Sequence, residues 1–281
     1  MRPMRSFDYV RPRTLAEALE LLAAHGERAA LLAGGTDLVV QVGKGVRAPD
    51  VVVDLKRVAG LSARIEDRTT HLRIGALACL ADLVADEAAC ARLPALIEAA
   101  RAIGSVQIRN RATVAGNICN ASPAADTAPP LLVYGARVNV VGPDGRRTAP
   151  IEEFFIGPGR TALARGEIVE SVEVSYPEAG TGSAFERLAR RRGMDLALVS
   201  VACLAGPGGR VRFGLGAVGP TPILVTADVA PEPSDDVLMR LAARATPISD
   251  IRAGEDYRRA MVLVLMRRTL QTALHRMKEG G

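Results

Sequence analysis

The sequence predicts an α+β protein with more than one domain, and three observations support this. Its 281 residues are enough for two domains of ordinary size, each with its own core. In the first part of the chain, short β-branched runs alternate with helical patterns. Beyond residue 178, two alternating apolar runs precede two helical stretches, which is typical of an α+β unit. The sequence therefore indicates an ordinary globular fold in which strands and helices are partly segregated.

The first 56 or so residues predict a small α/β unit. Thr14 and Glu17 have the spacing of a capping box, and leucines then recur at helical intervals. The run "AALLA" follows as a short strand, and "VVVDL" at 51–55 is a second β-branched run. A glycine-bearing loop separates these two strands.

The stretch 57–177 predicts a second subdomain. "HLRIGALACL", which begins at residue 71, reads as a strand that leads into helical stretches through about residue 103, broken once at Pro94. A second glycine-bearing loop, "TVAGNICNASPAAD", is followed by a short helix in "TAPPLLVYGA". "RVNVVGPDGRRTAPI" predicts a hairpin, and "EIVESVEVSYP" supplies one more strand. We expect a domain boundary at Pro177.

The remaining residues, 178–281, predict a C-terminal α+β domain. Two alternating apolar runs flank "GPGG" at 206–209 and indicate paired strands. Helices are expected over about 235–245 and 256–277.

Composition excludes several classes of protein. Aromatic residues make up only 3% of the chain, which disfavours a nucleic-acid-binding protein that stacks bases, despite the net charge of +5. Cys79, Cys90, Cys119 and Cys203 are too irregularly spaced for a metal site or a redox pair, so we expect reduced thiols. The N-terminus has no signal-peptide pattern, and no apolar run is long enough to span a membrane. We expect a soluble, cytoplasmic protein.

Two glycine motifs predict a site that binds an anionic ligand. In "LLAGGTDLVV", Gly34 and Gly35 let the backbone turn and let a ligand approach the amide groups, and a hydroxyl follows at Thr36. In the second motif, Thr113 and Asn117 flank another glycine. Two such loops suit the two charged groups of a pyrophosphate, although a tight turn is the alternative for each. Neither motif is a Walker sequence or a G-x-G-x-x-G fingerprint.

"LLAGGTDL", "TVAGNICNASPAADTAPPLL" and "RRRGMDLALVSVA" resemble the flavin-binding (medium) subunit of the molybdenum hydroxylases, the family that includes xanthine dehydrogenase and carbon monoxide dehydrogenase. The likeness extends from "SFDYVRP" to "DYRRAMVLVLMRR". It implies a PCMH-type FAD-binding domain of two subdomains over 1–177. It also implies a C-terminal α+β domain over 178–281, like that of the carbon monoxide dehydrogenase flavoprotein, which covers the flavin.

The resemblance also implies roles for individual residues, and all of them bind FAD. The pyrophosphate and ribityl chain would be wrapped by Leu32, Ala33, Gly34, Gly35, Thr36, Asp37 and Leu38. The same phosphates would be contacted from the second subdomain by Thr113, Gly116 and Asn117. Asp126 would accept a hydrogen bond from a sugar hydroxyl of the adenosine half, or cap the following helix, or do both. Apolar contacts would come from Ile103, Ile168 and Val169, and a positive charge near the flavin from Arg187. No catalytic residue or metal ligand is expected in this chain.

The implied function is electron relay. A large subunit would hydroxylate the substrate at a molybdenum cofactor, a small subunit would carry [2Fe-2S] clusters, and this chain's FAD would reduce NAD+, oxygen or a quinone. A dimer of heterotrimers would be the assembly, and an aldehyde, a purine or another N-heteroaromatic compound the substrate. Ala115 replaces a usual glycine of the second motif, and Leu196 stands where carbon monoxide dehydrogenases tend to have an aromatic residue, which disfavours carbon monoxide.

Two other functions stay open on the sequence. A self-sufficient FAD-dependent oxidoreductase would need its own acid or base, and the three histidines lie in no recognisable motif. A non-catalytic nucleotide-binding assembly subunit would carry no flavin. The run Arg190–Arg192 is either a docking patch for a partner or a solvated face.

Overall fold

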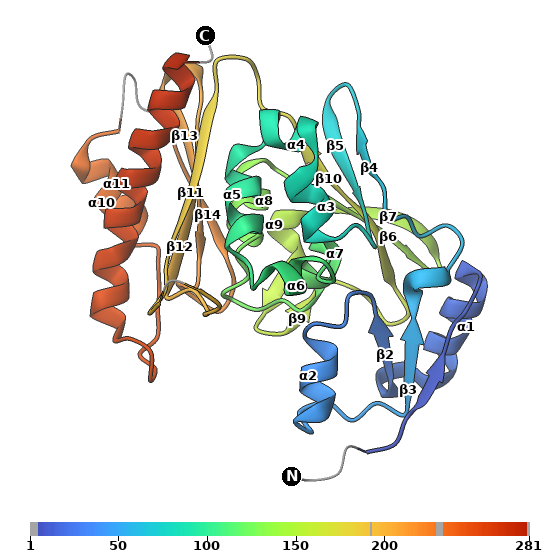
Figure 1. Cartoon of the computed structure of the whole chain (residues 1–281). Coiled ribbons are helices and arrows are strands. Elements are labelled where there is room, and N and C mark those ends of the chain that lie inside the picture. The colour runs from blue at the N-terminus through green and yellow to red at the C-terminus, as the bar shows by residue number, and fades with distance from the viewer. Residues whose placement is uncertain (1–4, 192, 229–232, 280–281) are drawn as a thin grey trace.

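The computed structural model describes residues 5–191, 193–228 and 233–279 and contains four β-sheets (Figure 1). The first is a parallel sheet in which β3 (Val51–Asp54) lies between β1 (Asp8–Val10) and β2 (Ala29–Leu32). Helix α1 (Leu15–His25) begins after Thr14, whose side chain accepts a hydrogen bond from the Glu17 N–H. The predicted helix and both predicted strands of this unit are confirmed. The short α2 (Leu38–Gly43), which follows the first glycine motif, was not expected.

A five-stranded antiparallel sheet forms the middle of the chain, in the order β4-β5-β10-β6-β7. Its strands are β4 (Ile65–Asp67), β5 (His71–Gly75), β6 (Arg137–Gly142), β7 (Gly145–Pro150) and β10 (Ile168–Ser175). The expected hairpin is confirmed, because β6 pairs with β7 across a two-residue turn of Pro143 and Asp144. A two-stranded sheet of β8 (Phe155–Gly157) and β9 (Arg160–Thr161) lies beside it.

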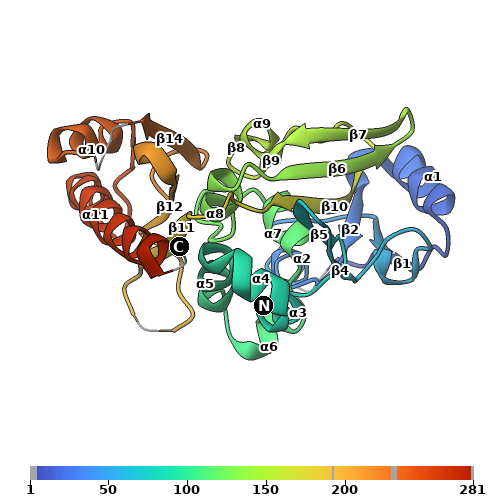
Figure 2. The same cartoon turned by 90° about the horizontal axis from the view of Figure 1, so that it is seen from above.

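Short helices pack with this sheet around the largest hydrophobic core of the molecule (Figure 2). They are α3 (Leu80–Ala85), α4 (Glu87–Arg92), α5 (Pro94–Ala102), α6 (Val106–Arg109), α7 (Val114–Cys119), α8 (Ala128–Val133) and α9 (Ile151–Phe154). The expectation of a single break at Pro94 was wrong. The helical stretch is interrupted twice, at Asp86 and at Leu93, and Pro94 begins α5, where its missing N–H costs nothing.

The C-terminal sheet is an antiparallel meander of β11 (Gly182–Leu188), β12 (Val199–Ala205), β13 (Arg210–Gly216) and β14 (Ile223–Asp228). Helices α10 (Asp235–Ala242) and α11 (Glu255–Glu279) cover one face, and α5 and α8 contact the other (Figures 1 and 2). Glycine permits both contacts. A Cβ on Gly182 would lie 1.9 Å from the Ala273 carbonyl of α11, and one on Gly214 would lie 2.2 Å from the Pro129 carbonyl of α8.

The expected pair of strands around residues 206–209 and both expected C-terminal helices are confirmed. The outer strands β11 and β14 were not expected. Within the described ranges, no helix is both long and apolar enough to span a membrane.

Candidate functional site

A pocket of about 910 Å³ lies where the two glycine motifs, β10 and the segment after β11 meet. All the residues for which a role is expected line this pocket, with the exception of Leu32. Leu32 lies beneath the first motif instead, because a Cβ on Gly35 would come within 2.8 Å of its side chain. A volume of this size is near the upper end for small-molecule sites and suits a large ligand.

The first motif exposes a row of backbone donors. Gly35 has φ +80°, a conformation that favours glycine. In the part of the chain that the structure describes, no protein group accepts a hydrogen bond from the N–H of Gly35, Thr36 or Asp37. Successive free N–H groups in such a turn form an anion-binding concavity. The motif therefore offers donors, which a phosphate oxygen can accept.

The first motif packs against the residues that lead into the second motif, and Gly34 makes this contact. A Cβ on Gly34 would lie 1.9 Å from the carbonyl oxygen of Arg111, two residues before Thr113. Only glycine permits this approach. Gly34 thus brings the first subdomain against the second, and both motifs line one pocket as a result.

The second motif was expected as a loop over its whole length, and this was wrong for its first part: Val114–Cys119 is the helix α7, and residues 120–127 form the loop that follows it. Thr113 caps the helix, because its Oγ1 accepts a hydrogen bond of 2.9 Å from the Gly116 N–H. The Asn117 Oδ1 accepts a hydrogen bond of 2.6 Å from the hydroxyl of Thr127, which is fully buried. This bond fixes the amide of Asn117 with its Nδ2 donors free for another acceptor. Ala115 is buried in the main core, so its methyl group is accommodated.

Asp126 forms an ion pair inside the pocket. Its Oδ2 lies 2.6 Å from Nη1 of Arg187, which comes from β11 in the C-terminal sheet. Asp126 is only 5% exposed, and its Oδ1 is buried without a hydrogen-bond partner. Burial raises the pKa of Asp126 to about 6, although Arg187 opposes that shift. Asp126 does not cap the next helix, because the residue before α8 is Thr127; that alternative was wrong.

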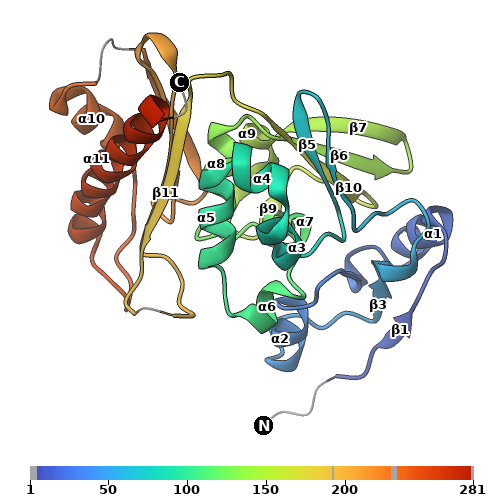
Figure 3. The same ribbon diagram turned by 45° about the horizontal axis from the view of Figure 1, so that its top comes forward.

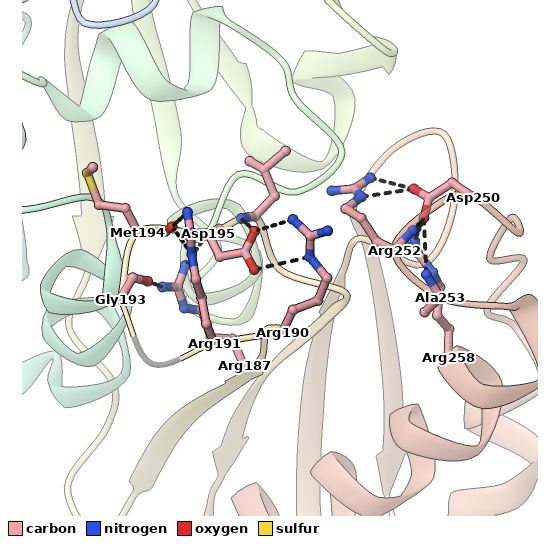
Figure 4. Close-up of polar contacts among 11 residues, drawn as sticks. Arg187, Arg190, Arg191, Gly193, Met194, Asp195, Asp250, Arg252, Ala253 and Arg258 are labelled. Carbon is pink, nitrogen blue, oxygen red and sulfur yellow. Dashed lines mark hydrogen bonds and ion pairs between the residues drawn. The ribbon is translucent and has the colours of Figure 1, made fainter.

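Arg187 also holds the segment that follows β11 (Figure 4). It donates hydrogen bonds to the carbonyls of Gly193, at 3.4 Å, and Asp195, at 3.2 Å. Arg190 pairs with the Asp195 carboxylate at 3.2 Å, and Arg191 donates to the Met194 carbonyl. Arg190 and Arg191, two members of the expected docking patch, are therefore engaged by their own segment. The third member, Arg192, lies outside the described residues.

Several residues of the pocket were missed by the sequence reasoning. The Gln41 Nε2 donates to the Asn120 Oδ1 at 3.1 Å, which links α2 to the end of α7 across the pocket wall. Arg47 and Met194 also line the pocket. So does Leu196, which the resemblance had placed at the position of a family aromatic residue. Gln41 stands alone in an apolar run and Asn120 at the end of a helix 79 residues further on, so only the fold reveals their pairing.

The chemistry of the pocket fits a dinucleotide. Free N–H groups on the first motif and the amide of Asn117 are donors for phosphate oxygens, and the orphaned Oδ1 of Asp126 is a buried acceptor for a sugar hydroxyl. Ile103, Ile168 and Val169 supply apolar wall. Within the described ranges, no group of three or more His, Cys, Asp or Glu residues is placed to hold a metal ion.

Comparisons with known proteins agree with this reading. Residues 5–177 match the family model of the FAD binding domain in molybdopterin dehydrogenase, and residues 183–273 match that of the CO dehydrogenase flavoprotein C-terminal domain. The chain is 34% identical over 283 residues to the xanthine dehydrogenase FAD-binding subunit of Escherichia coli O157:H7, covering 95% of each protein. It is 31% identical to the carbon monoxide dehydrogenase medium chain of Afipia carboxidovorans, covering 97% of this chain and 98% of that one.

A solved structure has the same fold. Carbon monoxide dehydrogenase from Hydrogenophaga pseudoflava, in a form that lacks the Mo-pyranopterin moiety of its cofactor, superposes with a TM-score of 0.91 at 32% identity. The match covers 98% of this chain and 99% of that chain. The expected fold class is thereby confirmed.

Proposed function

The chain belongs to the family of FAD-binding subunits of molybdenum hydroxylases, and from this premise we propose that it relays electrons from partner subunits, through FAD in the pocket described above, to a final acceptor. It is an oxidoreductase subunit, and its cofactor is FAD. FAD accepts electrons and passes them on, and the protein supplies position and electrostatics. The observation that carries the proposal is the convergence of both glycine motifs and the Asp126–Arg187 pair on one pocket.

The residues of this chain bind and orient. We assign the pyrophosphate to the free N–H groups of Gly35, Thr36 and Asp37 and to the amide of Asn117. Thr127 acts one step away, because it fixes that amide. Gly34 contributes by letting the two subdomains close on the ligand.

The Asp126–Arg187 contact changes one expectation. Asp126 was expected at the adenosine half of FAD and Arg187 near the flavin ring, but a separation of 2.6 Å puts both at the same part of the pocket. We propose that both act at the flavin half, where Met194 and Leu196 of the C-terminal domain add apolar cover. The orphaned Oδ1 of Asp126 would then accept a hydrogen bond from a ribityl hydroxyl.

We propose a molybdenum-binding large subunit and a [2Fe-2S] small subunit as partners, in a dimer of heterotrimers in the cytoplasm. The relatives' names, a FAD-binding subunit and a medium chain, support the presence of partner subunits. The substrate would be an aldehyde, a purine or another N-heteroaromatic compound, bound on the large subunit. The four cysteines are all free thiols, as is usual for a reducing compartment.

The first experiment is the absorption spectrum of the purified chain, before and after denaturation, with mass spectrometry of the released molecule. One FAD per chain is the expected result. A chain that is colourless and takes up no added FAD would contradict the proposal and favour the assembly-subunit alternative. As a second step, Asn117→Asp should weaken FAD binding, because a carboxylate would replace the amide donors beside a phosphate.

A further inference from the structure

The net charge of the chain comes from two segments that lie together. Residues 38–49 and 99–125 contain no Asp or Glu and carry one lysine and four arginines, Lys44, Arg47, Arg101, Arg109 and Arg111. The chain has 36 basic and 31 acidic residues in all, so the rest of it is balanced at 31 of each. The excess of +5 is therefore concentrated in these two segments.

The fold places the two segments side by side at the FAD pocket. The Gln41–Asn120 hydrogen bond joins them directly, and residues of both line the pocket wall. Their helices α2 and α6 lie next to each other at the same side of the molecule (Figures 1 and 3). We call the exposed residues of 38–49 and 99–125 the acid-free surface.

The cations of this surface are unpaired. Lys44, Arg47, Arg101 and Arg111 are exposed, and none of them forms an ion pair with a described residue. The nearest acid in sequence on one side, Asp50, is engaged by Arg5 and Arg28 instead. Asp37, at the start of α2, is an exposed acid beside these cations, but the surface keeps an excess of positive charge, which attracts a negatively charged partner.

Apolar side chains lie among these cations. Val39 is 62% exposed, Val40 50%, Val46 73% and Val106 61%. Single exposed apolar residues are common, but four valines on two adjacent segments that carry no acid match the composition of an interface, with an apolar centre and a charged rim. A partner that fits has acidic residues around an apolar centre.

We propose that the acid-free surface is the docking site for the subunit that delivers electrons to FAD, and that this subunit presents an acidic rim around an apolar patch. The inference rests on the proposed function. The surface is continuous with the pocket, because Arg47 is both exposed and part of the pocket wall. A donor seated there is adjacent to the bound cofactor, and charge complementarity directs it to this side.

The test uses the chain co-expressed with the large and small subunits of its complex. The variant K44E/V46D reverses one charge and replaces the most exposed of the four valines with an acid, and neither residue lines the pocket. The matched control is M239D/R240E on α10, where a cation and an apolar residue are likewise exposed, on the opposite side of the molecule (Figure 1). Affinity for the small subunit, FAD content and the unfolding midpoint are measured for each.

We expect K44E/V46D to weaken association by at least about tenfold while the control stays close to wild type. The affinity of the wild type should fall with rising NaCl, because exposed charges are screened. Unchanged association of K44E/V46D would overturn the proposal. A second outcome would also overturn it: K44E/V46D still forms the complex with the small subunit, but it no longer binds duplex DNA or anionic vesicles that the wild type binds. The surface would then bind a polyanion. A wild-type chain without FAD would instead count against the proposed function.

Discussion

Two arginine-rich regions of this molecule have opposite surroundings. The first, formed by residues 187–195 and 250–258, is a network in which each described arginine has acceptors nearby (Figure 4). The second, the acid-free surface, has exposed cations without ion-pair partners among the described residues. Arginine thus links neighbouring segments in one region and is an unpaired charge in the other.

The difference comes from where the acids lie. Asp250 accepts hydrogen bonds from Arg252 at 2.7 Å and from Arg258 at 2.6 Å, and these guanidinium groups, Arg252 first, hold the pKa of its carboxyl well below the usual range. Asp126 and Asp195 form ion pairs with Arg187 and Arg190. Basic residues that have acidic neighbours form ion pairs within the chain, whereas basic residues without such neighbours are available to a partner.

The largest effect is expected at Arg258, the most buried member of the paired region. It is 2% exposed and donates to Asp250 and to the Leu198 carbonyl, so it ties α11 to the residue before β12. Arg258→Met should lower the free energy of unfolding by about 3 kcal/mol, because it leaves Asp250 and a buried carbonyl short of donors. Urea unfolding measures this loss.

The matched control is Arg240→Met, which changes an exposed arginine of α10. Its free energy of unfolding should stay within about 0.5 kcal/mol of wild type. If both variants lost the same free energy of unfolding, the distinction between paired and unpaired arginines would not hold.

A smaller, pH-dependent effect is expected at Asp126. Its pKa is raised from 3.8 to about 6 in the folded chain, so the folded state binds the proton more tightly than the unfolded state. The corresponding stability is present in full below about pH 4 and is lost as the pH rises through about 6. Asp126→Asn removes this dependence, and the stability of FAD-free wild type relative to the variant should fall by up to about 3 kcal/mol from pH 4 to 7.

Urea unfolding at a series of pH values checks this expectation. Asp256→Asn is the control, because its side chain is 94% exposed, and its pH profile should follow wild type. A wild-type profile parallel to that of Asp126→Asn would show that the pKa of Asp126 is the same in the folded and unfolded chain. Arg187 would then offset the effect of burying the carboxyl.

Much of the fold could be predicted from local signals. The Thr14 cap, the Pro143–Asp144 turn and the β-branched run at 51–54 each specify an element from neighbouring residues, and the structure has all three. The pocket could be predicted equally well, because its glycines stand in two recognisable motifs. The helix α7 was missed, since its six residues include a glycine and its cap, Thr113, reads equally well as part of a loop.

What the sequence could not reveal depends on contacts between distant residues. The sequence suggested that the contiguous run Arg190–Arg192 is a docking patch. In the structure, however, Arg190 and Arg191 donate hydrogen bonds to residues five and three positions further along the chain. The acid-free surface is assembled from segments about 60 residues apart, so no single stretch reveals it. The Asp126–Arg187 pair joins residues 61 positions apart, one in the turn before α8 and one in β11, and it supports our proposal that both side chains serve one part of the ligand.

The smallest effect is expected at the exposed edge of the paired region. Arg190 bonds the Asp195 carboxylate and holds its pKa below the usual value, but the Arg190 side chain is 49% exposed and its ion pair is open to screening. Arg190→Gln should lower the thermal midpoint slightly at about 0.05 M NaCl and by nothing measurable at about 1 M. A loss for Arg190→Gln that persists at high salt would mean that the hydrogen bonds of Arg190, rather than its charge, hold residues 193–196 in place.

Lys44→Gln removes an unpaired charge from the acid-free surface. It should leave the thermal midpoint unchanged or raise it at low salt, because it reduces repulsion within that surface. A lower midpoint for Lys44→Gln would mean that Lys44 makes a stabilising interaction in the folded chain.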